Sequence, residues 1–306
     1  MITKFANAFY IKLGRGGKWE ADSIENGLLR LGWSGQLTQD INKHHWALIG
    51  KQLQEEHKGK RQVATNDLNR LRDIAESTPK DVWITFHKAK LWWTRLAPSP
   101  LENDAVSQFR RTLHPWKDRS ETGRLLVVNE LPGKIAQLQG FRGTVCSVQE
   151  KELLFRVLKG ARSGLATNIA RQRKSLANSL AKAISELHWK DFETLVDLVF
   201  RDAGWVRISV LGQHAKAYDL ELLEPITEHR YVVQVKSQAN RADLDDTVSQ
   251  FSSKDYHRVF FVVHSPAPDL ANANNLPEHV EVVPPAHLGE LAAMAGLSKW
   301  IEDKVA

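Results

Sequence analysis

The chain of 306 residues contains a single cysteine, Cys146. One cysteine can form neither an internal disulfide nor a zinc cluster, and this usage fits a protein of the reducing cytoplasm. The residues around it, Gly143-Thr144-Val145 and Ser147-Val148, are typical of a strand. We therefore expect Cys146 to be a packed core residue rather than a nucleophile. No group of His and Cys has zinc spacing, and no Ser-His-Asp arrangement of the hydrolase type is present.

Long apolar runs are also missing from the sequence. None approaches the roughly 20 residues that a membrane-spanning helix needs, and residues 1–10 lack a signal-peptide pattern. We expect a cytoplasmic protein with no membrane partner. Nucleotide-binding signatures are absent too, since neither a Walker A motif nor Gly-x-Gly-x-x-Gly occurs. The run Gly14-Arg15-Gly16-Gly17 is instead predicted to be a tight turn with a basic tip.

The charge is spread unevenly along the chain. The net charge is +6; residues 1–150 hold 23 basic and 16 acidic side chains, residues 151–188 hold 8 and 2, and residues 189–306 hold 11 and 18. A basic part that binds a polyanion, next to an acidic part that binds a cation, is one interpretation. The alternative is that the asymmetry only sets solubility or the docking of domains.

The hydrophobic pattern divides the chain into three parts. We predict a β-rich domain over residues 1–148, a basic helical linker over 149–188 and a catalytic domain over 189–306, in a fold of mixed α/β and α+β class. In the last part, apolar residues at helical spacing predict a helix from Trp189 to Asp202. Alternating and continuous apolar segments then predict a mixed sheet flanked by helices.

Seven of the ten tryptophans lie in the first 150 residues. The segments 81–87 and 91–96 predict a hairpin, in which Trp92 and Trp93 point to opposite faces, whereas 97–123 is predicted as a long loop or partly helical insertion. Tryptophan can stack on a nucleobase, and Trp33, Trp92 and Trp93 are our candidates for such a contact. The alternative for each is core packing, which holds for both hairpin tryptophans only if both sheet faces are covered.

The segment from about residue 165 to residue 188 is predicted to be a long helix with one basic face. That face carries Arg171, Arg173 and Lys174. We consider it a candidate contact to a nucleic-acid backbone. The alternatives are a rigid spacer, a dimerisation helix or simply a solvated face.

The segment Tyr231–Ser237 is the most informative stretch of the sequence. It predicts a strand whose alternation places Gln234 and Lys236 on one face. Residues 217–223 predict a second strand, with Asp219 and Glu221 on one face. If the two strands pair as a hairpin across residues 224–229, a carboxylate, an amide and an ammonium converge.

Such a convergence has a chemical use. Carboxylate and amide oxygens are hard ligands of the kind that Mg²⁺ prefers. A nearby lysine can orient an attacking water or stabilise charge on a transition state. The alternative is an ordinary Asp–Lys salt bridge on the face of a sheet.

The order of these elements resembles the PD-(D/E)xK nucleases, and more narrowly the Mrr-like restriction endonuclease catalytic domain. The residues that carry the resemblance are Trp189-Lys190-Asp191-Phe192-Glu193, Ala203-Gly204-Trp205, Asp219 and Gln234-Val235-Lys236. The resemblance implies that Asp219 binds metal, Gln234 supports the metal site, Lys236 is catalytic and Glu193 assists. The Gly-rich run that family members often carry around the Asp is replaced here by residues 212–218, which leaves the geometry before Asp219 open.

Residues 1–148 resemble, in layout, PUA-like domains of the EVE type, which bind modified bases. Together the two resemblances imply a Mg²⁺-dependent restriction endonuclease that cleaves modified or foreign double-stranded DNA, with Mn²⁺ as an alternative metal and a homodimer for double-strand cleavage. Our expected metal ligands are Asp219, Gln234, the Val235 carbonyl and Glu193, with Glu221 in reserve. Two other hypotheses stay open: a non-catalytic nucleic-acid-binding protein on a nuclease fold, and a ribonuclease.

Overall fold

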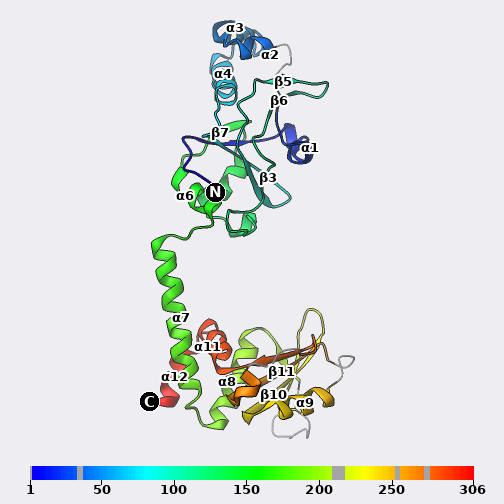
Figure 1. The fold of residues 1–306 in the computed structure, drawn as a ribbon, viewed down its shortest axis with the longest axis vertical. Coiled ribbons are helices and arrows are strands. Elements are labelled where there is room, and N and C mark those ends of the chain that lie inside the picture. The colour runs from blue at the N-terminus through cyan, green and yellow to red at the C-terminus, as the bar shows by residue number, and fades with distance from the viewer. Residues whose placement is uncertain (1, 33–36, 209–217, 252–255, 272–275) are drawn as a thin grey trace. The chain divides into compact units, whose positions relative to one another are not determined.

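The structure is a computed structural model that describes residues 2–32, 37–208, 218–251, 256–271 and 276–306. The chain forms two compact units, Met1–Ser163 and Gly164–Ala306 (Figure 1). The segment 149–188, predicted as a separate linker, is shared between them. Its helix α6 (Lys151–Lys159) buries Leu154 and Leu158 in a core of the first unit, whereas α7 (Gly164–Ile184) belongs to the second.

The N-terminal unit contains two small sheets. A four-stranded sheet has the order β4-β3-β1-β7, in which β1 runs parallel to β3 and the other pairs are antiparallel; a three-stranded antiparallel sheet has the order β2-β6-β5. The strands are β1 (Ala8–Ile11), β2 (Leu28–Leu31), β3 (Val82–His87), β4 (Lys90–Thr94), β5 (Glu102–Asn103), β6 (Gln108–Arg111) and β7 (Val145–Ser147).

Short helices connect these strands. They are α1 (Glu20–Asn26), α2 (Thr38–Asn42), α3 (Trp46–Glu56), α4 (Arg61–Ala75), α5 (Gly133–Ala136) and α6, with single 3-10 turns at Arg15–Gly17, Val128–Glu130 and Gln137–Gly140. Helix α6 ends where Gly160 adopts a left-handed conformation with φ of 72°. Glycine takes this conformation without steric cost, so it terminates the helix.

Both faces of the four-stranded sheet are covered. Phe9 and Trp83 pack in one core together with residues of α3 and α4, whereas Tyr10 and Trp93 pack in a second core with α6. Cys146 of β7 is half-buried at the second core, and burial raises the pKa of its thiol, which disfavours the thiolate. Its prediction as a packed residue is confirmed.

Strand β6 falls within the stretch that the sequence analysis predicted to be a loop or partly helical. Its four residues pair with β2, and Arg110 is 3% exposed. The Arg110 guanidinium donates to the carbonyls of Ile74 and Ser77 at the end of α4, at 2.8 and 2.9 Å. These long-range contacts stabilise a strand whose own sequence does not alternate.

The C-terminal unit is built on one five-stranded mixed sheet. Its order is β12-β11-β10-β9-β8, with β10, β11 and β12 parallel and β8, β9 and β10 antiparallel. The strands are β8 (Val206–Arg207), β9 (Leu220–Leu223), β10 (Arg230–Ala239), β11 (Arg258–Pro266) and β12 (Val280–Val283). The helices are α7, α8 (Trp189–Asp202), α9 (Arg241–Gln250), α10 (Pro268–Ala271), α11 (Pro285–Met294) and α12 (Ser298–Val305).

The alternation of β10 explains why its two faces differ. Val233 and Val235 point into the core that contains the apolar stripe of α8, whereas Val232 points into the core beside α9. Gln234 and Lys236 share the face of Val232 because side chains alternate along a strand. Strand β11 is apolar on both faces, as expected of a central strand covered on both sides.

Helices α7 and α11 lie side by side within this unit (Figure 1). A Cβ at Gly289 of α11 would lie 2.6 Å from the carbonyl oxygen of Ala177 and 2.9 Å from the backbone nitrogen of Ala181, both on α7. The glycine therefore allows the two backbones to approach closely.

We expect Gly289→Ala to destabilise the C-terminal unit by about 1–3 kcal/mol, because overpacking outweighs the gain in helix propensity of roughly 1 kcal/mol. Urea unfolding of the full chain would measure the change. The control is Gly164→Ala in α7, where a Cβ would meet no atom within 4 Å. Equal midpoints for the two variants would contradict the close packing.

Candidate active site

Asp219 lies immediately before β9 and opposite Gln234 of β10. The register pairs Leu220 with Val233, so Asp219 and Gln234 are cross-strand neighbours on one face of the sheet. The Gln234 Nε2 donates to Asp219 Oδ2 at 2.5 Å, and the Val235 backbone N–H donates to the same oxygen at 2.7 Å. The predicted hairpin therefore forms, and it fixes the carboxylate against β10.

Lys236 lies on the same face of β10 as Gln234 and is half-buried. Within the described residues, it forms no ion pair and no hydrogen bond, and in particular none with Asp219. The alternative of an ordinary Asp–Lys salt bridge is therefore not what the structure contains. A partly buried ammonium without a partner costs free energy, which is tolerated where the charge has another use.

Glu221 also lies on this face, but other groups hold its carboxylate. The Tyr218 hydroxyl donates to Glu221 Oε2 at 2.9 Å, and the Arg230 guanidinium lies 3.4 Å from Oε1. The hydrogen bond to Glu221, together with burial, raises the pKa of Tyr218. Tyr218 thus supports the strand beside Asp219, a role that the sequence analysis did not assign.

Glu193 is positioned by α8, which packs on the other face of the sheet. Its neighbour Phe192 is 1% exposed in the core that contains Val233 and Val235. The structure thus brings together three of the four predicted catalytic residues and leaves Glu193 on a separate element.

His264, at the end of β11, lies on the same side as α8. Its ring meets Phe192 edge-on, with centroids 5.0 Å apart, and its Nδ1 lies 2.8 Å from the Ser265 hydroxyl. The buried Nε2 has no hydrogen-bond partner among the described residues. These contacts do not join His264 to Asp219.

The donor set around Asp219 suits a hard cation. The Asp219 carboxylate, the Gln234 amide oxygen and the Val235 carbonyl are oxygen donors, the type that Mg²⁺ and Mn²⁺ prefer in such sites. In this structure Gln234 presents its Nε2 to the carboxylate, so a half-turn of the amide would present Oε1 instead. Three or more His, Cys, Asp or Glu residues gather nowhere in the described part of the chain.

The predicted nucleic-acid contacts on α7 are exposed. Arg171, Arg173 and Lys174 all face solvent, and the Arg171 guanidinium donates to Asn168 at 2.7 Å. Arg173 and Lys174 also line a cavity of about 280 Å³ between α7 and α11, together with Glu290. Their exposure is compatible with binding a phosphate backbone.

The predicted base contacts of the N-terminal unit differ from one another. Trp93 is 1% exposed and its indole N–H donates to the Arg119 carbonyl at 2.9 Å, which leaves no ring face for a base. Trp92 is half-buried, packs against the opposite core and donates to the His87 carbonyl at 3.2 Å. Both faces of the sheet are covered, which is the condition under which both side chains pack. Trp33 lies outside the described residues.

A comparison with protein families identifies the segment that contains this site. Residues 184–281 match the Mrr_cat family, which is described as "Restriction endonuclease". The Mrr_cat segment covers about a third of the chain and includes α8, β9 and β10, and therefore Asp219, Gln234 and Lys236. The match supports a restriction-type endonuclease, and the predicted resemblance of the C-terminal part is confirmed.

The solved structure of the DNA modification-dependent restriction endonuclease AspBHI is similar at a TM-score of 0.35 and 12% sequence identity, over 88% of this chain and 73% of that one. No curated protein matches the chain. In addition, none of the helices in the described part of the chain is both long and apolar enough to cross a membrane.

Proposed function

We propose that the protein is a metal-dependent DNA endonuclease of restriction type, which hydrolyses phosphodiester bonds at the face of β10. The observation that carries this proposal is the geometry of the Mrr_cat segment. There Asp219 is held by Gln234 and the Val235 N–H, and the ammonium of Lys236 lies on the same face without a carboxylate partner.

Each residue has a defined task in this proposal. The Lys236 ammonium orients the attacking water and offsets the negative charge that develops on the scissile phosphate. The Asp219 carboxylate holds the cation, and Gln234 and the Val235 carbonyl complete the oxygen donors beside it. A divalent cation, Mg²⁺ or Mn²⁺, supplies Lewis-acid stabilisation of the phosphoryl oxygens when bound. Glu193 would assist from α8.

The proposed substrate rests on the positive charge of the N-terminal unit and on the resemblance of that unit to modified-base readers. Residues 1–163 contain 27 basic and 17 acidic side chains, whereas residues 164–306 contain 15 and 19. A basic unit attached to a nuclease suits double-stranded DNA, and we propose that it reads modified or foreign DNA as an EVE-type domain would. Cleavage of both strands favours two copies acting together.

The experiment that tests this function compares three substrates in Mg²⁺ buffer. Duplex DNA that carries modified bases, single-stranded RNA and duplex RNA of the same sequence are incubated with the full chain, and the products are separated by length. We expect endonucleolytic cleavage of the duplex DNA alone. Cleavage of RNA in preference to DNA would favour a ribonuclease, and binding without cleavage of any substrate would favour a non-catalytic protein.

A further inference from the structure

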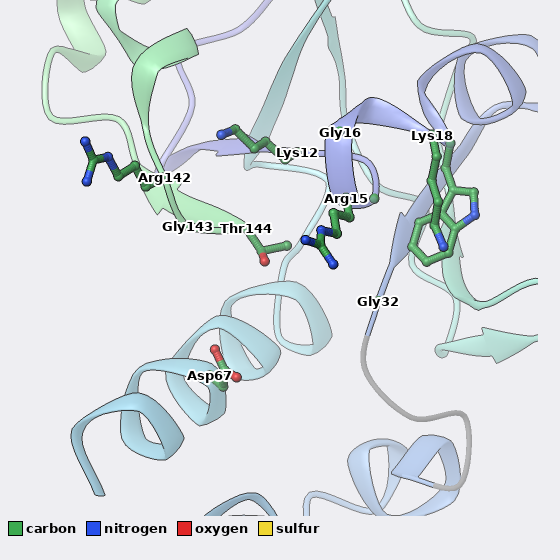
Figure 2. A pocket seen from close by; sticks show the side chains of 11 residues that line it. Lys12, Arg15, Gly16, Lys18, Gly32, Asp67, Arg142, Gly143 and Thr144 are labelled. Carbon is green, nitrogen blue, oxygen red and sulfur yellow. The ribbon is translucent and has the colours of Figure 1, made fainter. Parts of the chain in front are cut away.

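The N-terminal unit contains a basic cavity of about 510 Å³, far in the sequence from the Mrr_cat segment. Four cations line it: Lys12, Arg15 and Lys18 from the segment after β1, and Arg142 from the segment before β7. Figure 2 shows Arg15 in the centre of the view, with Lys12 and Arg142 to one side of it and Lys18 to the other. A volume of this size lies in the range typical of small-ligand sites, roughly 300–1,000 Å³.

The four cations have no ion-pair partner in the part of the chain that the structure describes. None of them forms an ion pair or a side-chain hydrogen bond with any residue that the structure describes. Among the described residues of the lining, Asp67 of α4 is the single carboxylate, and His57 Nε2 already lies 2.9 Å from it. Four positive charges around one cavity favour an anion inside it.

Several other cations of the same unit are paired with carboxylates, although exposed lysines such as Lys43 and Lys51 form no ion pair with any described residue. Arg30 contacts Asp22 and Asp104, and Lys90 lies 2.7 Å from Asp118. Carboxylates thus pair with cations elsewhere in the unit, whereas the four cations of this cavity have no such partner among the described residues.

Two glycines in the cavity wall have backbone conformations and surroundings that a larger residue would change. Gly14 and Gly16 adopt φ of 85° and 66°, values that disfavour other residues. A Cβ at Gly16 would meet no heavy atom within 4 Å, so the space beside it is open. A Cβ at Gly14 would lie 2.8 Å from the Trp19 ring, so the glycine allows the turn to pack against the indole.

Trp19 adds an aromatic wall to the positive cavity. Its indole is half-buried, and the Lys18 ammonium lies 4.3 Å from its ring centroid. It also borders a second cavity of about 300 Å³ that Asp104 lines. An aromatic ring beside cations is a combination that proteins use to bind nucleotides. The base stacks on the ring, and the cations neutralise the phosphate.

We propose that this cavity binds a nucleoside phosphate, with the phosphate held by Arg15, Lys12 and Arg142 and the base packed on Trp19. The ligand can come from two sources: a free nucleotide or a nucleotide unit of a DNA strand. The proposal does not rest on the nuclease site, since every residue that it uses belongs to the N-terminal unit.

The test measures binding in EDTA, where no cleavage occurs, on a full chain that also carries Lys236→Ala. The probes are the four deoxynucleoside 5′-monophosphates, followed by tryptophan fluorescence, and a labelled 12-nucleotide single strand, followed by anisotropy. The double variant Lys12→Ala/Arg15→Ala removes two cavity cations. The control Lys43→Ala/Lys51→Ala removes two exposed cations that do not line the cavity.

We expect the cavity variant to weaken binding by about 10- to 100-fold and the control by less than about 3-fold. Weakened monophosphate binding assigns the site to a free nucleotide, and an effect on the strand alone assigns it to DNA. Arg142→Ala, from a separate segment, must act in the same direction, and unchanged melting temperatures show that the variants fold. Absence of binding to both probes, or equal losses in variant and control, would overturn the proposal.

Discussion

Replacing Lys236 by alanine is expected to reduce the cleavage rate of duplex DNA by about 10²- to 10⁴-fold while leaving the fold intact. The fold should survive because the Lys236 ammonium has no ion pair or hydrogen bond with a described residue, so its removal leaves no partner group unpaired there. Loss of a half-buried unpaired charge should lower the free energy of unfolding by less than about 1 kcal/mol, or should raise it. Single-turnover cleavage and thermal melting measure the two quantities separately.

The matched control for this substitution is Lys190→Ala. Lys190 is an exposed lysine of α8 in the same unit, and its ammonium lies 5.3 Å from the centroid of the Trp189 ring. We expect its activity to remain within a factor of about 2–3 of the wild type, as for an ordinary surface change. Full cleavage by the Lys236 variant, or a loss of cleavage that merely follows a loss of folding, would contradict the role assigned to this ammonium.

Asp219→Asn is expected to lower the cleavage rate by a similar factor, because it removes the negative charge of the carboxylate. The substitution keeps the shape and one acceptor oxygen for the Val235 N–H, but it removes the negative charge that would hold a divalent cation. We expect cleavage to fall by about 10³-fold or more, since loss of several kcal/mol of charge stabilisation corresponds to that factor.

A second measurement on the same variant does not depend on activity. A cation that binds the folded chain alone raises its melting temperature, by an amount that follows the ratio of free cation to dissociation constant. We expect Mn²⁺ to stabilise the wild type and to have little effect on Asp219→Asn. The control is Glu281→Gln, a carboxylate paired with Arg258 at the edge of the sheet, which should retain the shift. Equal shifts of the melting temperature in both variants would show that the cation does not bind at Asp219.

Regular local patterns allowed the sequence to predict much of the C-terminal unit. The apolar stripe of α8 and the alternation of β10 are strong periodic signals, and both elements occur where expected. The same alternation predicted the shared face of Asp219, Gln234 and Lys236, because register and turn position followed from it. The Val235 N–H bond to Asp219 was not predictable, since it depends on the position of the carboxylate after folding.

Long-range packing limited prediction in the N-terminal unit. Strand β6 is stabilised by β2 and by the buried Arg110, which hydrogen-bonds to carbonyls 36 and 33 residues away. The faces of Trp92 and Trp93 were predicted correctly, but the sequence does not show that α4 and α6 cover both. Likewise, the basic turn around Arg15 was predicted, whereas its meeting with Arg142 depends on the pairing of β1 with β7.

The most direct test of the central claim is plasmid cleavage by the full wild-type chain in Mg²⁺. The substrates are four otherwise identical plasmids: unmodified, and carrying 5-methylcytosine, 5-hydroxymethylcytosine or N6-methyladenine. Conversion of supercoiled to linear DNA is followed with time. The account predicts linear product from some modified plasmids and none from the unmodified one. Binding to all four plasmids without cleavage of any would contradict a nuclease, and equal cleavage of all four would contradict the reading of modified bases.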